Sequence, residues 1–246
     1  MNYILYNPKS GQKNNENKLE QLKQELNLPD ATGLSVLDIN YNDFLNSLTK
    51  EDNVYICGGD GTINRAVNIL YNKELVCPFY YHAKGTGNDF ATDVAKEMVN
   101  NCFYLNDHIK HLPRVIVNGE EYRFVNGIGF GIDGEACRVA DEKAARGETK
   151  IDYAAISVNL LLFHYKKPKA TVEIDGKTYN FKNVWLASSM KGVYYGGGMK
   201  IAPNQNRYED DLTFVCLHRR CRLTTLIAFP SLFKGEHINK KGLTTI

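Results

Sequence analysis

The first hundred residues alternate short apolar runs with stretches in which apolar residues recur every three or four positions. The short runs predict strands at residues 3–6, 34–39, 54–57 and 78–82. The helical pattern covers Leu19, Leu22 and Leu26 and predicts further helices at 43–48, 63–70 and 90–99. Alternating strands and helices indicate an α/β fold, with a Rossmann-like parallel sheet covered by helices on both faces.

The pattern changes after residue 108, where strand pairs and hairpin turns replace the alternation. Asn118-Gly119 joins predicted strands at 114–117 and 122–126, and Asp175-Gly176 joins strands at 171–174 and 178–181. Further strands are expected at 184–189 and 212–217, and helices at 135–145 and 153–163. We therefore expect a nucleotide-binding domain at 1–108 and a mainly antiparallel, β-sandwich-like domain at 109–246. The boundary should fall near 105–112, with the active site in a cleft between the domains.

Three polar loops follow predicted strands of the first domain, at 7–11, 58–62 and 85–89. Ligands of parallel sheets bind beyond the carboxyl ends of the strands. The loop Gly58-Gly59-Asp60-Gly61-Thr62 is the most informative, because glycines let a backbone approach a ligand and a helix start attracts anions. Thr62 is the expected N-cap. A carboxylate at Asp60 beside a phosphate needs a cation, so the loop predicts a nucleotide with Mg²⁺. A capped turn without a ligand is the alternative.

Composition narrows the setting. Hydrophobic residues make up 43% of the chain and the net charge is +2, which argues neither for nor against nucleic acid. The six cysteines form no CxxC motif or zinc spacing, so we interpret them as reduced thiols. The chain shows no basic-then-apolar leader and no apolar run long enough to span a bilayer. We expect a cytoplasmic protein.

Five motifs, in their order and spacing, resemble those of the diacylglycerol kinase catalytic-domain family, which includes bacterial lipid kinases and sphingosine kinases. They are Asn7-Pro-Lys-Ser-Gly11, Gly58–Asn64, Gly85-Thr-Gly-Asn-Asp-Phe90, Asn126-Gly-Ile-Gly-Phe-Gly-Ile-Asp-Gly134 and Gly196-Gly-Gly-Met-Lys-Ile-Ala-Pro203. The match runs nearly end to end. The segment from Gly129 to Gly134 also fits GxGxxG, which we treat as chance because it lies in the hairpin-rich half.

The resemblance implies an ATP-dependent kinase that phosphorylates a lipid hydroxyl, most simply diacylglycerol, with Asp60 acting through Mg²⁺. Lys9 and Arg65 would be cations near the phosphates, unless they are merely solvated. The implied nucleotide-binding residues are Asn7, Pro8, Lys9, Ser10, Gly11, Gly58, Gly59, Asp60, Gly61, Thr62, Ile63, Asn64, Arg65, Gly85, Thr86, Asn88 and Asp89.

Two further sites follow from the resemblance. Asp133 would accept the proton of the lipid hydroxyl, although a turn or N-cap aspartate before a helix at 135 is the alternative. A structural metal would be held by Asn206, Glu209 and Asp211, in a loop where Glu209-Asp210 replaces the usual Asp-Gly.

The end of the chain departs from the family. Members usually continue to an Asp-Gly-Glu whose Glu is a candidate base, whereas this sequence stops at Ile246. We expect the second domain to lack its C-terminal end, the natural reading frame to extend further, and residues 1–246 to bind nucleotide but phosphorylate lipid weakly.

Other functions and partners stay open. NAD kinases also carry a GGDGT loop, and a non-catalytic nucleotide-binding protein derived from a lipid kinase is a third hypothesis. The lipid partner implies peripheral binding at the inner membrane surface, with no nucleic-acid partner and a homodimer left open. The apolar segment 153–165 and Lys166, Lys167 and Lys169 fit such docking, or a buried helix ending in solvated lysines.

Overall fold

The computed structural model describes residues 1–8, 17–85, 88–148, 151, 153–219, 221–238 and 241–246. The chain forms two compact units, Met1–Val125 and Asn126–Ile246. The division lies after residue 125, whereas the sequence analysis placed the boundary near 105–112. Each unit is described by itself.

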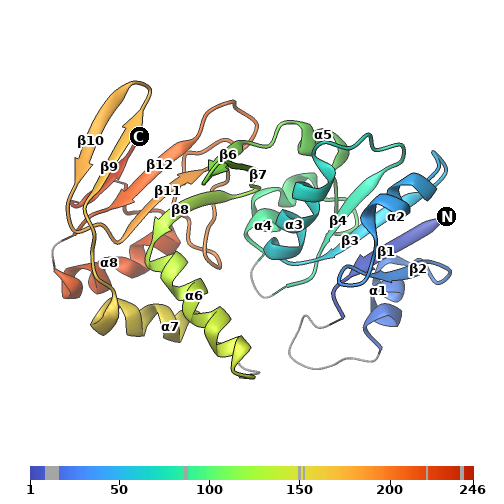
Figure 1. Ribbon diagram of the computed structural model, residues 1–246, viewed down its shortest axis with the longest axis horizontal. Coiled ribbons are helices and arrows are strands. Elements are labelled where there is room, and N and C mark those ends of the chain that lie inside the picture. The colour runs from blue at the N-terminus through green and yellow to red at the C-terminus, as the bar shows by residue number, and fades with distance from the viewer. Residues whose placement is uncertain (9–16, 86–87, 149–150, 152, 220, 239–240) are drawn as a thin grey trace. The chain divides into compact units, whose positions relative to one another are not determined.

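The first unit is built on a five-stranded sheet in the order β2-β1-β3-β4-β5 (Figure 1). Its strands are β1 (Asn2–Tyr6), β2 (Thr32–Ser35), β3 (Asn53–Gly58), β4 (Phe79–Ala83) and β5 (Cys102–Tyr104). The first four strands are parallel, and β5 pairs antiparallel with β4. The Rossmann-like expectation is confirmed, with an antiparallel edge strand added.

Helices cover both faces of this sheet because neighbouring side chains along a strand point to opposite faces. Ile4 packs with Leu22 of α1 on one face, while Leu5 belongs to the core that holds Phe44 and Val67 on the other. The helices are α1 (Lys18–Leu26), α2 (Tyr41–Ser47), α3 (Asp60–Leu70), α4 (Asp89–Asp93), the 3₁₀ turn η1 (Ala95–Glu97) and α5 (Asn106–Lys110). The helix expected at 90–99 is therefore two short pieces.

A hairpin of β6 (Arg114–Val117) and β7 (Glu120–Arg123) completes the first unit. Its turn residues Asn118 and Gly119 have φ of 53° and 87°, as a type I′ turn requires. The Asn68 side chain of α3 donates to the Arg123 carbonyl at 2.8 Å and accepts the Arg123 N–H at 2.7 Å. These bonds explain why the hairpin belongs with the sheet of the first unit.

The second unit is a mainly antiparallel β-rich unit, as expected. β8 (Gly127–Gly131), β11 (Leu186–Met190), β12 (Thr213–Leu217) and β13 (Leu243–Thr245) form a sheet ordered β13-β12-β11-β8, while β9 (Ala170–Ile174) and β10 (Lys177–Phe181) form a hairpin. The hairpin covers one face of the sheet, where Cys216 packs near Phe181. Val215, the neighbour of Cys216, points into a second core on the other face.

Helices cover that other face. They are α6 (Ile132–Ala145), α7 (Tyr153–Asn159), the π-helical turn η2 (Leu160–His164) and α8 (Arg222–Lys234). Leu161 of η2 and Leu226 of α8 pack against Trp185 and Val215 of the sheet side. The sequence analysis did not anticipate α8, because its apolar residues follow no single face. Within the described residues, no helix has both the length and the apolar character needed to cross a bilayer.

Candidate active site

A hollow of about 310 Å³ lies at the carboxyl ends of β1 and β3. After β1 the chain passes to β2 on one side, and β3 then lies on the other side of β1. Adjacent strands whose connections leave in opposite directions create the crevice where doubly wound sheets bind ligands. The lining residues are Leu5, Asn7, Val36, Tyr41, Ile56, Gly59, Gly61, Thr62, Arg65 and Ala66.

The hollow has an apolar part and a polar part. Leu5, Val36 and Ile56 supply aliphatic side chains and Tyr41 an aromatic one, whereas the glycine loop and Arg65 supply polar groups. The sequence analysis found the polar part and missed the apolar part. The positions of Leu5 and Ile56 near the ends of apolar runs were a usable signal, but nothing in the sequence singled out Tyr41.

Two hydrogen-bond donors fix the carbonyl group at the start of the glycine loop. The Gly58 carbonyl accepts the Tyr81 hydroxyl at 2.9 Å and the Lys84 N–H at 2.7 Å. Burial raises the pKa of Tyr81, so its hydroxyl stays protonated and remains a donor. These bonds fix the point at which the chain leaves β3.

Helix α3 begins at Asp60, with Gly59 in the N-cap position and no side-chain cap. Thr62 therefore lies inside the first turn, where its N–H donates to the Gly59 carbonyl at 2.9 Å. The prediction that Thr62 caps the helix is wrong, because the helix begins at Asp60, three residues before the predicted start at 63. Its threonine side chain lines the hollow instead.

The loops after β3 and β4 touch backbone to backbone. A Cβ atom on Gly85 would lie 2.7 Å from the Gly59 Cα and 3.2 Å from the Gly59 nitrogen. Real Cβ atoms essentially never show the shorter of these distances. Glycine at position 85 therefore lets two of the three predicted ligand loops meet.

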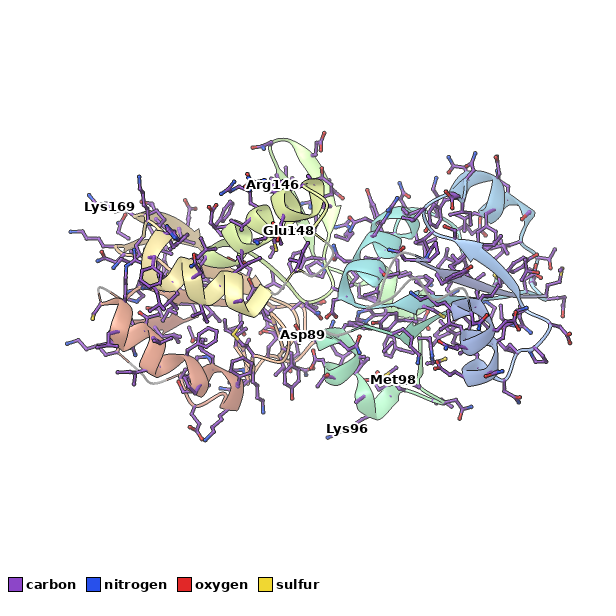
Figure 2. The ribbon with its side chains drawn as sticks, turned by 90° about the horizontal axis from the view of Figure 1, so that it is seen from below. Asp89, Lys96, Met98, Arg146, Glu148 and Lys169 are labelled. Atoms are coloured by element: carbon purple, nitrogen blue, oxygen red, sulfur yellow. The ribbon has the colours of Figure 1, made fainter. Side chains whose placement is uncertain are left out.

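Asp60 joins the same two loops through its carboxylate. Its two oxygens accept the N–H groups of Asp89 and Phe90, each at 2.9 Å. Asp89 is buried at the start of α4 (Figure 2), and Phe90 lies in the core of the first unit. Asp60 thus orients α4 as well as the loop, a role that sequence reasoning missed.

The remaining predicted nucleotide residues divide into three groups. Asn88 donates to the Gly85 carbonyl at 3.0 Å, and its buried Oδ1 has no hydrogen-bond partner among the described residues. Ile63 is buried in the core, and Asn64 accepts the Val125 N–H at 3.3 Å, so both side chains serve the fold. Lys9, Ser10, Gly11 and Thr86 lie outside the described residues.

The first loop is held by a residue that the sequence analysis did not select. Lys18 of α1 donates from Nζ to the Asn7 carbonyl at 2.7 Å, beside the half-buried Pro8. Burial lowers the pKa of Lys18. Because Asn7 lines the hollow, Lys18 positions its backbone there.

Asp133 lies within the first turn of α6, since that helix begins at Ile132 rather than at 135. The Tyr195 hydroxyl donates to Asp133 Oδ2, while the buried Oδ1 has no hydrogen-bond partner in the described part of the chain. Gly196, Gly197 and Gly198 follow Tyr195 with φ of 61°, 84° and 100°. The glycine turn brings the fifth motif against the fourth.

The loop predicted to hold a metal is ordered by its own hydrogen bonds. Asn206 donates to Glu209 Oε1 at 2.8 Å, and Asp211 Oδ1 accepts from Gln205 at 3.3 Å. No group of three or more His, Cys, Asp and Glu side chains that could hold a metal occurs among the described residues. The set of Asn206, Glu209 and Asp211 contains only two such residues and stays a prediction.

Two family models match this chain and together cover nearly all of it. The diacylglycerol kinase catalytic domain matches residues 2–118, and the YegS C-terminal NAD kinase beta sandwich-like domain matches residues 126–246. Residues 2–118 therefore belong to the diacylglycerol kinase catalytic-domain family, and the resemblance that the five motifs predicted is confirmed.

Individual relatives agree at low identity. The "Putative lipid kinase YtlR" of Bacillus subtilis is 23% identical over 218 residues, covering 79% of this chain and 67% of that protein. The diacylglycerol kinase of Mycobacterium tuberculosis is 24% identical over 203 residues, covering 79% of this chain and 64% of that protein. The chain thus spans about two thirds of the length of these relatives.

A solved structure shares the fold. The crystal structure of a "putative diacylglycerol kinase" from Bacillus anthracis superposes with a TM-score of 0.64 at 19% identity. The superposition covers 100% of this chain and 83% of that one.

Proposed function

We propose that this protein is an ATP- and Mg²⁺-dependent lipid kinase that transfers the γ-phosphate to a lipid hydroxyl, with diacylglycerol as the expected acceptor. The observation that carries the proposal is the hollow between β1 and β3, which combines an apolar wall with a glycine loop. Family membership supports the same chemistry. The lipid acceptor places the working protein at the inner membrane surface, without a nucleic-acid partner.

The two parts of the hollow suit the two parts of a nucleotide. The base would rest against Val36 and Tyr41, and the phosphates would face Gly59, Gly61 and the start of α3. N–H groups and the dipole at a helix start favour anions. Arg65 lines the same hollow and adds a positive charge.

The carboxylates of Asp60 and Asp89 fit Mg²⁺, because hard cations prefer oxygen ligands. When bound with ATP, the ion would neutralise charge on the transferring phosphoryl group. The N–H groups of Asp89 and Phe90 hold the Asp60 carboxylate in one orientation. The Asp60 side chain is therefore already ordered before a nucleotide or an ion binds.

Asp133 is the proposed general base. The lipid oxygen would attack the γ-phosphorus as its proton passes to the Asp133 carboxylate, and the bond to ADP would break. The Tyr195 hydroxyl donates to Asp133 Oδ2 and so orients this carboxylate. A positioned base contributes roughly 10²–10⁴ in rate.

Replacing Asp60 with asparagine tests the proposal. One amide –NH₂ would then face a backbone donor, so we expect about 1–3 kcal/mol of lost stability and at least a hundredfold loss of phosphoryl transfer. Transfer from radiolabelled ATP to diacylglycerol in mixed micelles measures the rate, and calorimetry measures MgATP binding. Asp107→Asn, an exposed change on α5, is the matched control. Unchanged turnover in Asp60→Asn would remove its proposed role.

NAD kinase is the second candidate, favoured by the match of residues 126–246 to an NAD kinase-like sandwich. The same assay with NAD as acceptor separates the two. We expect no NADP, and NADP formed from NAD and ATP would replace the lipid proposal.

A further inference from the structure

Helix α8 is apolar on both its inner and its outer side. Thr225 and Leu232 are buried, whereas Leu223 and Ile227 are 62% and 71% exposed. Leu223, Ile227 and Pro230 recur at helical spacing, so they form one outer stripe. A surface helix normally carries polar residues there.

Helix α1 shows the usual arrangement and provides the contrast. Its buried residue is Leu22, while its sequence KLEQLKQEL places four charged residues among nine. In α8, Arg222 and Lys234 at the two ends are the only charged residues. The outer side of α8 therefore needs an apolar surrounding that water does not supply.

The neighbouring segment α7–η2 repeats this pattern. Leu160 and Leu161 are buried, whereas Phe163 is 67% exposed and Val158 is also exposed. Helix α8 packs against η2, and the two lie side by side in Figure 2. We call the exposed residues Val158, Phe163, Leu223, Ile227 and Phe233 the outer helical face.

Arg222 fixes the two helical segments to each other. Its guanidinium donates to the Leu161 carbonyl at 2.5 Å and to the Tyr165 carbonyl at 2.8 Å. These carbonyls lie at the end of η2, where a cation offsets the helix dipole. The two segments that carry the outer helical face are thus held together at this point.

The charged residues of the segments that carry this face are all basic. Residues 153–169 and 219–234 contain seven Lys and Arg and no Asp or Glu. The whole chain has 30 basic and 28 acidic residues, so the rest of the molecule is net acidic. Lys166, Lys169 and Lys234 are exposed in the same segments. Apolar side chains bordered by lysines match an anionic bilayer, which takes the former at its acyl boundary and the latter at its head groups.

We infer that the outer helical face docks this protein on an anionic lipid bilayer. The inference rests on the proposed function in one respect, since a lipid kinase must reach a bilayer to find its acceptor. A second copy of this protein fits the outer helical face less well than a bilayer does. A two-fold interface would bring the basic face against itself, and like charges repel.

Vesicle flotation with wild type and Leu223→Ser/Ile227→Ser tests the inference. We expect wild type to bind vesicles of phosphatidylcholine with about one third phosphatidylglycerol, and to bind much less at high salt or without the anionic lipid. The double variant should bind at least tenfold more weakly. Val99→Ser/Ile116→Ser removes two apolar side chains of similar exposure, 71% and 60%, from the first unit and should bind like wild type.

A charge variant and a folding control make the test decisive. Lys166→Glu/Lys169→Glu should also weaken binding tenfold or more, and thermal unfolding should show that all three double variants remain folded. The inference would be overturned if the serine variant bound the anionic vesicles as tightly as wild type. It would also be overturned if wild type bound only to vesicles without anionic lipid. A dimer that dissociates in the serine variant would also overturn it.

The result is separable from the kinase assay. Vesicle binding without phosphoryl transfer would contradict the proposed function and leave the docking surface standing. Phosphoryl transfer to detergent-dispersed lipid without vesicle binding would support the proposed function and contradict the docking surface.

Discussion

The glycine loop after β3 and the glycine-rich strand β8 have similar sequences, GGDG and GIGFG. Their surroundings differ. In β8, a Cβ on Gly129 would lie 2.5 Å from the Ala187 carbonyl oxygen, and one on Gly131 would lie 2.4 Å from the Trp185 carbonyl oxygen. In the loop, a Cβ on Gly61 would meet nothing within 4 Å.

The difference assigns the two sets of glycines to different tasks. Those of β8 let two strands approach each other, so they serve packing in the second unit. Gly61 borders open space beside the hollow, which fits the proposed nucleotide site. Gly85 combines both, because it lets one loop pack against another at the same hollow. Two glycines of the GxGxxG match, Gly129 and Gly131, serve packing in β8, whereas the third, Gly134, lies in α6.

The largest effect is expected from a substitution at Gly129, one of the packed glycines of β8. Gly129→Ala should destabilise the second unit by about 1–3 kcal/mol, because the added methyl group overpacks against β11. Trp185 is the single tryptophan and is buried in the second unit, so its fluorescence during urea unfolding measures this unit.

Gly134→Ala is the matched control for that experiment. A Cβ there would meet nothing within 4 Å, and the position lies inside α6. Alanine should therefore stabilise by about 0.5–1 kcal/mol. Equal unfolding midpoints for the two variants would contradict the packing role of β8.

A smaller and more local effect is expected at Gly85. Gly85→Ala should push the loops after β3 and β4 apart and weaken MgATP binding at least tenfold in calorimetry. The Trp185 unfolding transition should not move, since the change lies in the first unit. A shift in that transition with normal MgATP affinity would reverse the assignment.

The smallest effect is expected at Gly61, in the glycine loop after β3. Gly61→Ala should leave the fold intact, or stabilise α3 by up to about 1 kcal/mol, because alanine favours helix. Its methyl group should nevertheless weaken MgATP binding several-fold by occupying the space beside the hollow. Unchanged affinity would show that Gly61 does not face the nucleotide.

The candidate site was partly readable from sequence. Gly58, Asp60 and Gly85 stood out because several glycines and a carboxylate at strand-to-helix turns favour a phosphate-binding loop over a capped turn without a ligand. Tyr41 did not stand out, because its place in the hollow depends on how α2 folds over β1 and β3. The second role of Asp60 was hidden for the same reason, since its partners lie 29 and 30 residues further along the chain.

The sequence by itself determined the family, the parallel sheet with helices on both faces and the two hairpins, because these depend on local periodicity, turn chemistry and motif order. Only the tertiary structure decided that β5 runs antiparallel, that the hairpin of β6 and β7 belongs to the first unit, and that α6 begins at Ile132. The hairpin is assigned by the hydrogen bonds of Asn68 to Arg123. Contacts between residues far apart in the chain leave no periodic trace in sequence, so packing alone establishes them.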